Sequence, residues 1–166
     1  MSGSSPLVLA LDLSTRTGWA CGRAGGEPDH GVLPLPSAIG HGPIGTSFMD
    51  QLLGLWRVQH FERVVMEAPL PPQSQTHANT ARIQYGLAFL VEVFCDRRSI
   101  PVREARPDDW RKAVLGRARF GGTDKAKAAC IAWCQGQGWD PQDDNAADAL
   151  ALWRYATTRP GSRSAA

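Results

Sequence analysis

Three acidic residues occupy positions where an ionised side chain is unusual. Asp12 lies near the end of the apolar run 7–13, Glu67 ends the apolar segment 63–67, and Asp148 lies among alanines in a helix predicted over 143–155. Burying an unpaired carboxylate is costly, so each group requires a cation, a hydrogen-bond donor or water beside it. For Asp12 alone, capping of the following turn is a sufficient explanation. The case for chemistry therefore depends on whether the carboxylates converge.

The last predicted helix places more oxygen ligands on one face. Asp144 and Asp148 are four residues apart and Asn145 and Asp148 are three apart, so the three side chains lie on the same side of the helix. The helix dipole explains acidic residues in a first turn, but Asp148 lies beyond that turn. Together with Asp12 and Glu67, these residues would form an all-oxygen site for a hard cation such as Mg²⁺. Two such ions can activate water and stabilise the leaving oxygen in phosphodiester cleavage.

Positive charge is concentrated in one segment of the chain. Residues 103–127 contain eight basic and four acidic side chains, a net charge of +4, whereas the whole chain of 166 residues carries +2. A local basic patch on an otherwise balanced protein indicates an anionic partner such as nucleic acid, although such runs are often only solvated faces.

Composition is that of an ordinary soluble protein. Apolar residues make up 43% and charged residues 20%, and the apolar runs are too short to span a bilayer. No basic residue precedes the first apolar run, so we expect no signal peptide. The four cysteines lack paired zinc-site spacings, and Cys130 and Cys134 are expected to be small core residues of a cytoplasmic, reducing setting.

The elements predicted around these residues define a single-domain α/β protein. Strands are predicted at 7–13, 19–22, 30–35, 63–67 and 100–105, with a tight turn at Ser14, Thr15 and Gly18. The strand at 30–35 is expected at a sheet edge because it contains Pro34. Helices are predicted after a Thr46 cap, over 80–97, over 107–115, from a Thr123 cap to about 137, and over 143–155. The tail 157–166 is predicted to be disordered, which leaves a domain over 1–156.

The order of these motifs resembles a known family. A strand with Asp12 followed by Ser14 and Gly18, a second strand ending in Glu67, and the late run Asn145-Ala-Ala-Asp-Ala-Leu-Ala are similar to the RuvC-type Holliday junction resolvases, in particular their phage-borne relatives. The resemblance covers residues 8–155. It implies the RNase H-like fold, a mixed central β-sheet flanked by helices, and carboxylates that bind Mg²⁺, for which Mn²⁺ is expected to substitute.

By position, the resemblance assigns Asp12, Glu67 and Asp148 as metal ligands. The family has a fourth acidic residue where this chain has Asn145, and an amide oxygen is a poorer ligand for Mg²⁺. Either Asn145 ligates weakly or Asp144 substitutes, and we favour Asp144. Lys125 matches a basic residue near the scissile phosphate. The implied catalytic set is therefore Asp12, Glu67, Asp144, Asp148 and Lys125.

The basic segment supplies the expected DNA contacts. Arg111 or Lys112 matches a further basic position less securely, because the loop 116–122 is longer than the family pattern. Phe120 either stacks on a base or covers the protein's own core, and the polar segment 73–84 either faces a junction or is a solvent-exposed loop. The residues expected to contact DNA are Arg111, Lys112, Arg117, Arg119, Phe120, Lys125 and Lys127.

The activity implied is that of a crossover junction endodeoxyribonuclease with two metal ions, acting on four-way DNA junctions in a bacterial or phage-infected cell. Symmetric cleavage needs two active sites, so the resemblance implies a homodimer, with the helix over 80–97 as the candidate interface. Two other classes of protein remain as alternatives. Residues 12–18 also resemble the first phosphate loop of actin-like sugar kinases, although no second such loop is present. A module that binds branched DNA without cutting it is compatible with Asn145.

Overall fold

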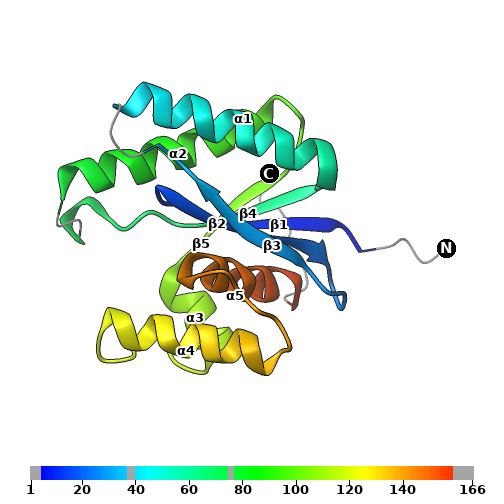
Figure 1. The fold of residues 1–166 in the computed structure, drawn as a ribbon, viewed down its shortest axis with the longest axis vertical. Coiled ribbons are helices and arrows are strands. Elements are labelled where there is room, and N and C mark those ends of the chain that lie inside the picture. Colours follow the sequence, from blue (N-terminus) through cyan, green and yellow to red (C-terminus); the bar gives the residue numbers. More distant parts are fainter. Residues whose placement is uncertain (1–4, 37–39, 75–76, 159–166) are drawn as a thin grey trace, which may run out of the picture.

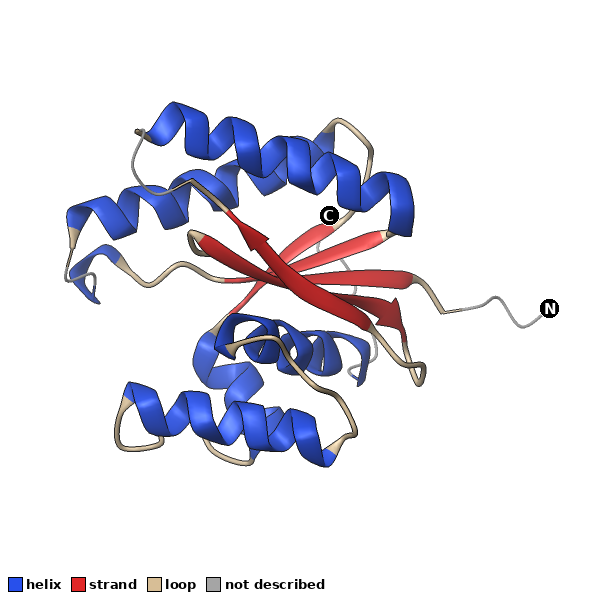
Figure 2. Ribbon diagram, in the orientation of Figure 1, coloured by secondary structure: helices blue, strands red, loops and turns tan. Residues whose placement is uncertain are grey.

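A mixed five-stranded sheet lies between two layers of helices in the computed structural model, which describes residues 5–36, 40–74 and 77–158 (Figures 1 and 2). The strand order is β3-β2-β1-β4-β5, in which β1, β2 and β3 are antiparallel and β1, β4 and β5 are parallel. The predicted α/β class and the edge position of β3 are confirmed. The strands are β1 (Leu7–Asp12), β2 (Arg16–Arg23), β3 (Asp29–Pro34), β4 (Arg63–Glu67) and β5 (Val102–Ala105).

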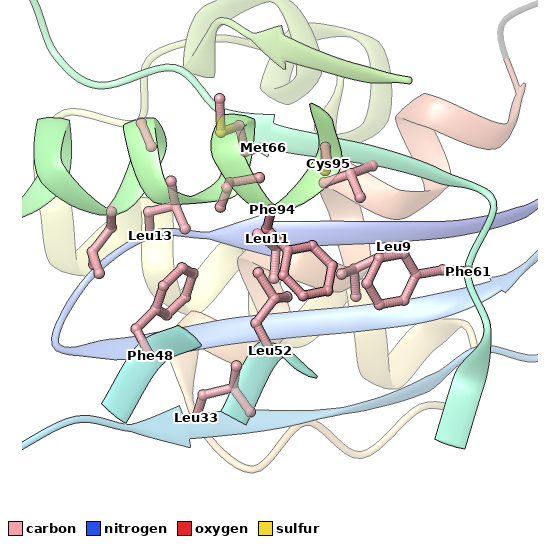
Figure 3. Packing of buried hydrophobic residues seen from close by; sticks show 14 of the residues in the cluster. Leu9, Leu11, Leu13, Leu33, Phe48, Leu52, Phe61, Met66, Phe94 and Cys95 are labelled. Carbon is pink, nitrogen blue, oxygen red and sulfur yellow. The ribbon is translucent and has the colours of Figure 1, made fainter. Parts of the chain in front are cut away.

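One face of the sheet is covered by two long helices, α1 (His41–Gln59) and α2 (Ala78–Asp96) (Figure 1). The short 3₁₀ turn η1 (Pro72–Ser74) precedes α2. Aliphatic and aromatic side chains from the strands and both helices fill the space between these layers, among them Leu11, Phe48 and Phe94 (Figure 3). Burial of this apolar surface is the main source of stability on this side.

The other face is covered by α5 (Asp144–Thr158), which packs directly on β1 and β2. Two shorter helices, α3 (Pro107–Leu115) and α4 (Thr123–Gly136), pack against α5 (Figure 1). Alanines make up much of the buried surface of α5, and small side chains allow a helix to approach a sheet closely. Cys130 and Cys134 are buried free thiols, as predicted, and the described Cys21 and Cys95 are also unpaired.

Several predicted boundaries were wrong. Helix α1 begins at His41, not after Thr46, because Pro43 lies in the first turn, where a missing N–H costs nothing. Gly18 lies inside β2 rather than in the turn. Helix α4 has Gly122, not Thr123, as its N-cap residue, and α5 continues to Thr158, two residues into the predicted tail. The rest of that tail, 159–166, lies outside the described residues.

None of the described helices is long and apolar enough to cross a membrane.

Candidate active site

Asp12 and Glu67 lie side by side because β1 and β4 are parallel neighbours. Their register pairs Leu11 with Met66, so the following residues of the two strands are adjacent. Leu11 and Met66 belong to the core beneath α1 and α2. Since side chains alternate along a strand, Asp12 and Glu67 point to the opposite face, toward α5. The two carboxylates therefore meet at the carboxyl ends of parallel strands.

The start of α5 is fixed by Asp143, which acts as its cap. Its Oδ1 accepts a hydrogen bond from the backbone N–H of Ala146 at 3.0 Å, and its Oδ2 pairs with Arg16 at 2.9 Å. Partial burial acts to raise the pKa of Asp143, but these hydrogen bonds hold it below its usual value. Arg16 opens β2, so the ion pair ties the loop after Asp12 to the helix that carries Asp148.

Close packing holds that helix against β2. A Cβ atom added to Gly18 would lie 1.9 Å from the backbone oxygen of Asn145. Only glycine fits there, and this explains a residue that the sequence analysis had placed in a turn. The close approach brings Asp144 and Asp148 toward the ends of β1 and β4.

Electrostatics show that the carboxylates have converged. Burial, followed by the negative charges of Glu67 and Asp148, raises the pKa of Asp12 well above its usual value. Burial also raises the pKa of Glu67 to about 7 and raises that of Asp148, with Asp144 adding to the latter. Repulsion of this kind disfavours a fully ionised cluster and favours a bound cation. Asp148 is also within hydrogen-bonding reach of the Cys130 thiol.

Two basic side chains offset part of this charge. The Arg111 guanidinium lies 3.8 Å from Asp148 and stacks on the ring of Trp110, and it lowers the pKa of Asp12, Glu67 and Asp148 against the larger effect of burial. Lys127 lies 2.7 Å from Asp144, and this hydrogen bond raises the pKa of Lys127. The sequence analysis predicted that both residues contact DNA and did not predict that they lie beside the carboxylates.

The indole of Trp110 completes the surroundings of Glu67. Its Nε1–H donates to Glu67 Oε2 at 2.8 Å, and the tryptophan is fully buried. The sequence analysis missed this residue, and no spacing in the sequence links a tryptophan in α3 to the end of β4. A second missed residue is Gln84 of α2, which lines a small cleft together with Asp12 and Glu67.

Other predicted site residues lie elsewhere. The side chain of Asn145 hydrogen-bonds Asp143, so it is Asp144 that adds its charge to the cluster. Lys125 is exposed, and because it is two residues from Lys127 in α4 it points to nearly the opposite side of the helix. The Arg117 guanidinium stacks on Phe120 at 4.8 Å, which covers the ring from within the loop. Lys112 and Arg119 are exposed. Of the segment 73–84, residues 75–76 lie outside the described residues.

The donor set suits a hard cation, although its side chains are not arranged around one. Among the described residues, no three His, Cys, Asp or Glu side chains are placed so that they could hold a metal ion as they are. The carboxylates of Asp12, Glu67, Asp144 and Asp148 nevertheless supply the oxygen ligands that Mg²⁺ prefers. A cation would have to draw these side chains together and displace Arg111 from Asp148.

Solved structures share this fold. No protein-family model matches the sequence, and no curated protein sequence matches it significantly. The structure is similar to RuvC of T. thermophilus in complex with a Holliday junction substrate (TM-score 0.69, 15% identity, 92% of this chain and 97% of that chain). It is also similar to a Thermus thermophilus RuvC structure (TM-score 0.66, 18% identity, 90% and 95%). A third similar structure is Ydc2, the yeast mitochondrial Holliday junction resolvase (TM-score 0.53, 14% identity, 91% and 78%).

The chain therefore has the RNase H-like fold of these resolvases, as the sequence motifs predicted. The finer resemblance to phage-borne relatives stays a prediction.

Proposed function

We propose that the protein is a Mg²⁺-dependent endonuclease that cleaves branched DNA, with the four-way junction as its substrate. The observation that carries this proposal is the convergence of Asp12, Glu67, Asp144 and Asp148 at one end of the sheet, where burial, with a smaller contribution from the neighbouring carboxylates, raises the pKa of Asp12, Glu67 and Asp148. A RuvC of the same fold has been solved with a Holliday junction bound. An acidic cluster beside a basic segment suits a metal-assisted reaction on a phosphodiester.

When bound, a pair of Mg²⁺ ions supplies activation of water and stabilisation of the leaving 3′ oxygen. Asp12 is close to Glu67, Asp148 and Asp144, so we assign it as a central member of the ligand set that would hold the ions. Glu67, Asp148 and Asp144 complete the ligand set, and Mn²⁺ is expected to replace Mg²⁺ because it accepts the same oxygen ligands. In the proposed reaction, the oxygen of a water molecule forms a bond to phosphorus, the bond between phosphorus and the 3′ oxygen breaks, and the 3′ oxygen takes up a proton, which leaves 5′-phosphate and 3′-hydroxyl ends.

Two lysines of α4 are candidates for holding the scissile phosphate. The resemblance assigns Lys125, whereas the ion pair with Asp144 places Lys127 at the carboxylates. Comparison of Lys125→Met with Lys127→Met in cleavage assays distinguishes them. Two further basic residues of the segment, Arg117 and Arg119, are proposed to bind phosphates on the arms of the junction, where such contacts give salt-dependent affinity.

A homodimer is proposed because symmetric nicking of two strands needs two active sites. Helix α2 exposes two aromatic side chains at i, i+4 spacing, Tyr85 at 42% and Phe89 at 64%. Exposed aromatic residues on one helix face are typical of interfaces. Phe89→Glu is expected to give a monomer in analytical ultracentrifugation, whereas Val58→Glu, at an exposed apolar residue of α1, is expected to leave the dimer intact. A wild-type protein that is monomeric at micromolar concentration would refute the dimer.

The decisive experiment is cleavage of a labelled four-way junction beside a linear duplex of the same sequence, in Mg²⁺, Ca²⁺ or EDTA. We expect paired symmetric nicks on the junction in Mg²⁺ alone, and their loss in Asp148→Asn. Asp50→Asn, at an exposed residue of α1, is the matched control and should cleave normally.

Other outcomes of the same assay point to other functions. Cleavage of many branched forms would indicate a debranching nuclease. Tight junction binding without cleavage in Mg²⁺ or Mn²⁺ would refute the enzyme and favour the binding module. Absence of both binding and cleavage would return attention to the phosphate-loop alternative.

A further inference from the structure

Trp110 combines complete burial with a directed hydrogen bond to a candidate metal ligand. Its ring is 0% exposed within the core beneath α5, and its Nε1–H lies 2.8 Å from Glu67 Oε2. An indole nitrogen is a donor only, and a buried ring cannot rotate to find another partner. The direction of this hydrogen bond is therefore fixed by the packing of α3 rather than by the carboxylate.

Glu67 needs such a partner more than Asp12 does. A glutamate has three side-chain torsions, so without a fixed partner its carboxylate samples several positions at the end of β4. The hydrogen bond engages Oε2, while Oε1 remains a second acceptor and both oxygens retain lone pairs. Trp110 can therefore hold the carboxylate in place without removing Glu67 as a ligand.

We propose that Trp110 is a positioning residue, whose indole N–H holds the Glu67 carboxylate in the orientation in which it binds the metal ion. The inference rests on the proposed function, because it assumes that Glu67 is a ligand. Groups that hydrogen-bond to metal ligands fix ligand geometry, and their loss weakens metal affinity 10–100-fold in other proteins. The family resemblance found in the sequence assigns no role to Trp110.

The chain contains a matched control for the competing view that Trp110 only fills the core. Trp153 in α5 is also 0% exposed, and its Nε1–H donates to the backbone oxygen of Gly22 at 3.1 Å. Trp153→Phe removes an equally buried indole donor on the same face of the sheet, but one that serves no carboxylate. A general loss of packing would appear in both variants.

The test is Mn²⁺ binding to the full chain, measured by isothermal titration calorimetry, with urea unfolding as a check on each variant. Trp110→Phe is expected to weaken Mn²⁺ affinity by about 10–100-fold, and Trp153→Phe to leave it within about twofold of wild type. Trp110→His keeps a ring N–H but fills less space, so a positioning role predicts tighter Mn²⁺ binding than in Trp110→Phe. A purely structural role predicts the reverse order.

A double-mutant cycle identifies the partner through which Trp110 acts. In a Glu67→Gln background, Trp110→Phe should have little further effect on Mn²⁺ affinity, because the ligand it positions is already lost. An equal loss in both backgrounds would overturn the proposal, as would unchanged affinity in Trp110→Phe or an absence of Mn²⁺ binding in the wild type.

The failure of this inference is distinguishable from failure of the proposed function. Mn²⁺ binding that depends on Glu67 and is weakened in Trp110→Phe, in a wild-type protein that leaves junction DNA intact, would refute the nuclease and keep the positioning role. Wild-type protein that cleaves junctions while Trp110→Phe binds Mn²⁺ normally would do the opposite.

Discussion

The two faces of the central sheet bury chemically different side chains. Beneath α1 and α2, the buried cluster is apolar, with a phenylalanine from each of the two helices and aliphatic side chains from β1, β3 and β4 (Figure 3). Beneath α5, the same strands bury alanines, cysteines and tryptophans, and at their carboxyl ends this layer adjoins Asp12, Glu67 and Asp148. Strand β1 illustrates how a strand contributes to both layers, because Leu11 points to one face and Asp12 to the other.

The difference shows where stability is gained and where it is given up. On the α1–α2 face, burial of apolar side chains is favourable by itself, and no ion pair or hydrogen bond is needed to offset a cost. On the α5 face, burial of like charges is unfavourable, and it is offset only in part by Arg111 and by the indole of Trp110. A cation bound to the carboxylates would offset this cost and raise the free energy of unfolding, because any ligand that binds only the folded state stabilises it.

The largest expected effect on this comparison comes from Gly18→Ala. The added Cβ would lie 1.9 Å from the Asn145 oxygen, so α5 has to move away from β2. We expect a loss of about 3 kcal/mol or more in the free energy of unfolding, measured by urea denaturation, and loss of junction cleavage. Near-normal stability would mean that the first turn of α5 moves easily.

Glu67→Gln tests whether the carboxylates lower stability. The pKa of Glu67 in the folded protein is about 7, above its ordinary value of 4.5, so its contribution to stability is complete below pH 4.5 and is lost as the pH rises to 7. In EDTA, the substitution should therefore raise the free energy of unfolding by about 3 kcal/mol at pH 8 and change it little at pH 4.

The control for that experiment is Glu27→Gln, in the exposed loop before β3, which should change unfolding at neither pH. An equal effect of Glu67→Gln at pH 4 and pH 8 would show that packing rather than charge is responsible.

Arg111→Met tests whether the Arg111 guanidinium and a metal ion compete for the same carboxylates. Without the guanidinium the carboxylates lose a counter-charge, so the metal-free protein should be less stable by about 1 kcal/mol in urea denaturation. Mn²⁺ should bind several-fold more tightly in calorimetry, because it no longer competes with Arg111 for Asp148. Arg57→Met, on the exposed side of α1, should affect neither quantity, and unchanged Mn²⁺ affinity in Arg111→Met would show that the guanidinium does not compete.

The smallest expected effect is a gain in stability from a substitution in α1, on the face of the sheet opposite α5. Gly54 lies inside α1 and nothing lies within 4 Å of a Cβ added there. Gly54→Ala should therefore raise the free energy of unfolding by about 0.5–1 kcal/mol through helix propensity, without altering cleavage. A loss of stability would indicate an unrecognised partner on α1.

Sequence reasoning succeeded where the signal was local. Short runs of apolar residues placed the strands, and Pro107 placed the start of α3 at the residue where it begins. The order of motifs around Asp12, Glu67 and Asp148 was sufficient to predict the fold. Glycine and proline in the first turn of α1 concealed its beginning, since both residues are also typical of loops.

Contacts between distant segments could not be predicted in the same way. The proximity of Lys127 to Asp144 depends on how α4 packs against α5, and the position of Arg111 depends on how α3 does. Residue spacing within one helix gives no information about either packing. The same limit explains why the hydrogen bond from Trp110 to Glu67 was missed.

The ion pair between Arg16 and Asp143 joins an early strand to the last described helix, so it can form only after both segments have been synthesised. The first strands leave the ribosome early, but the helix that must pack on them is the last described element of the chain. Asp12 and Glu67 therefore remain without Asp148 until translation has passed α5. A nascent chain halted before residue 143 contains all five described strands but not Asp144 or Asp148, so such a truncated product lacks the complete acidic cluster.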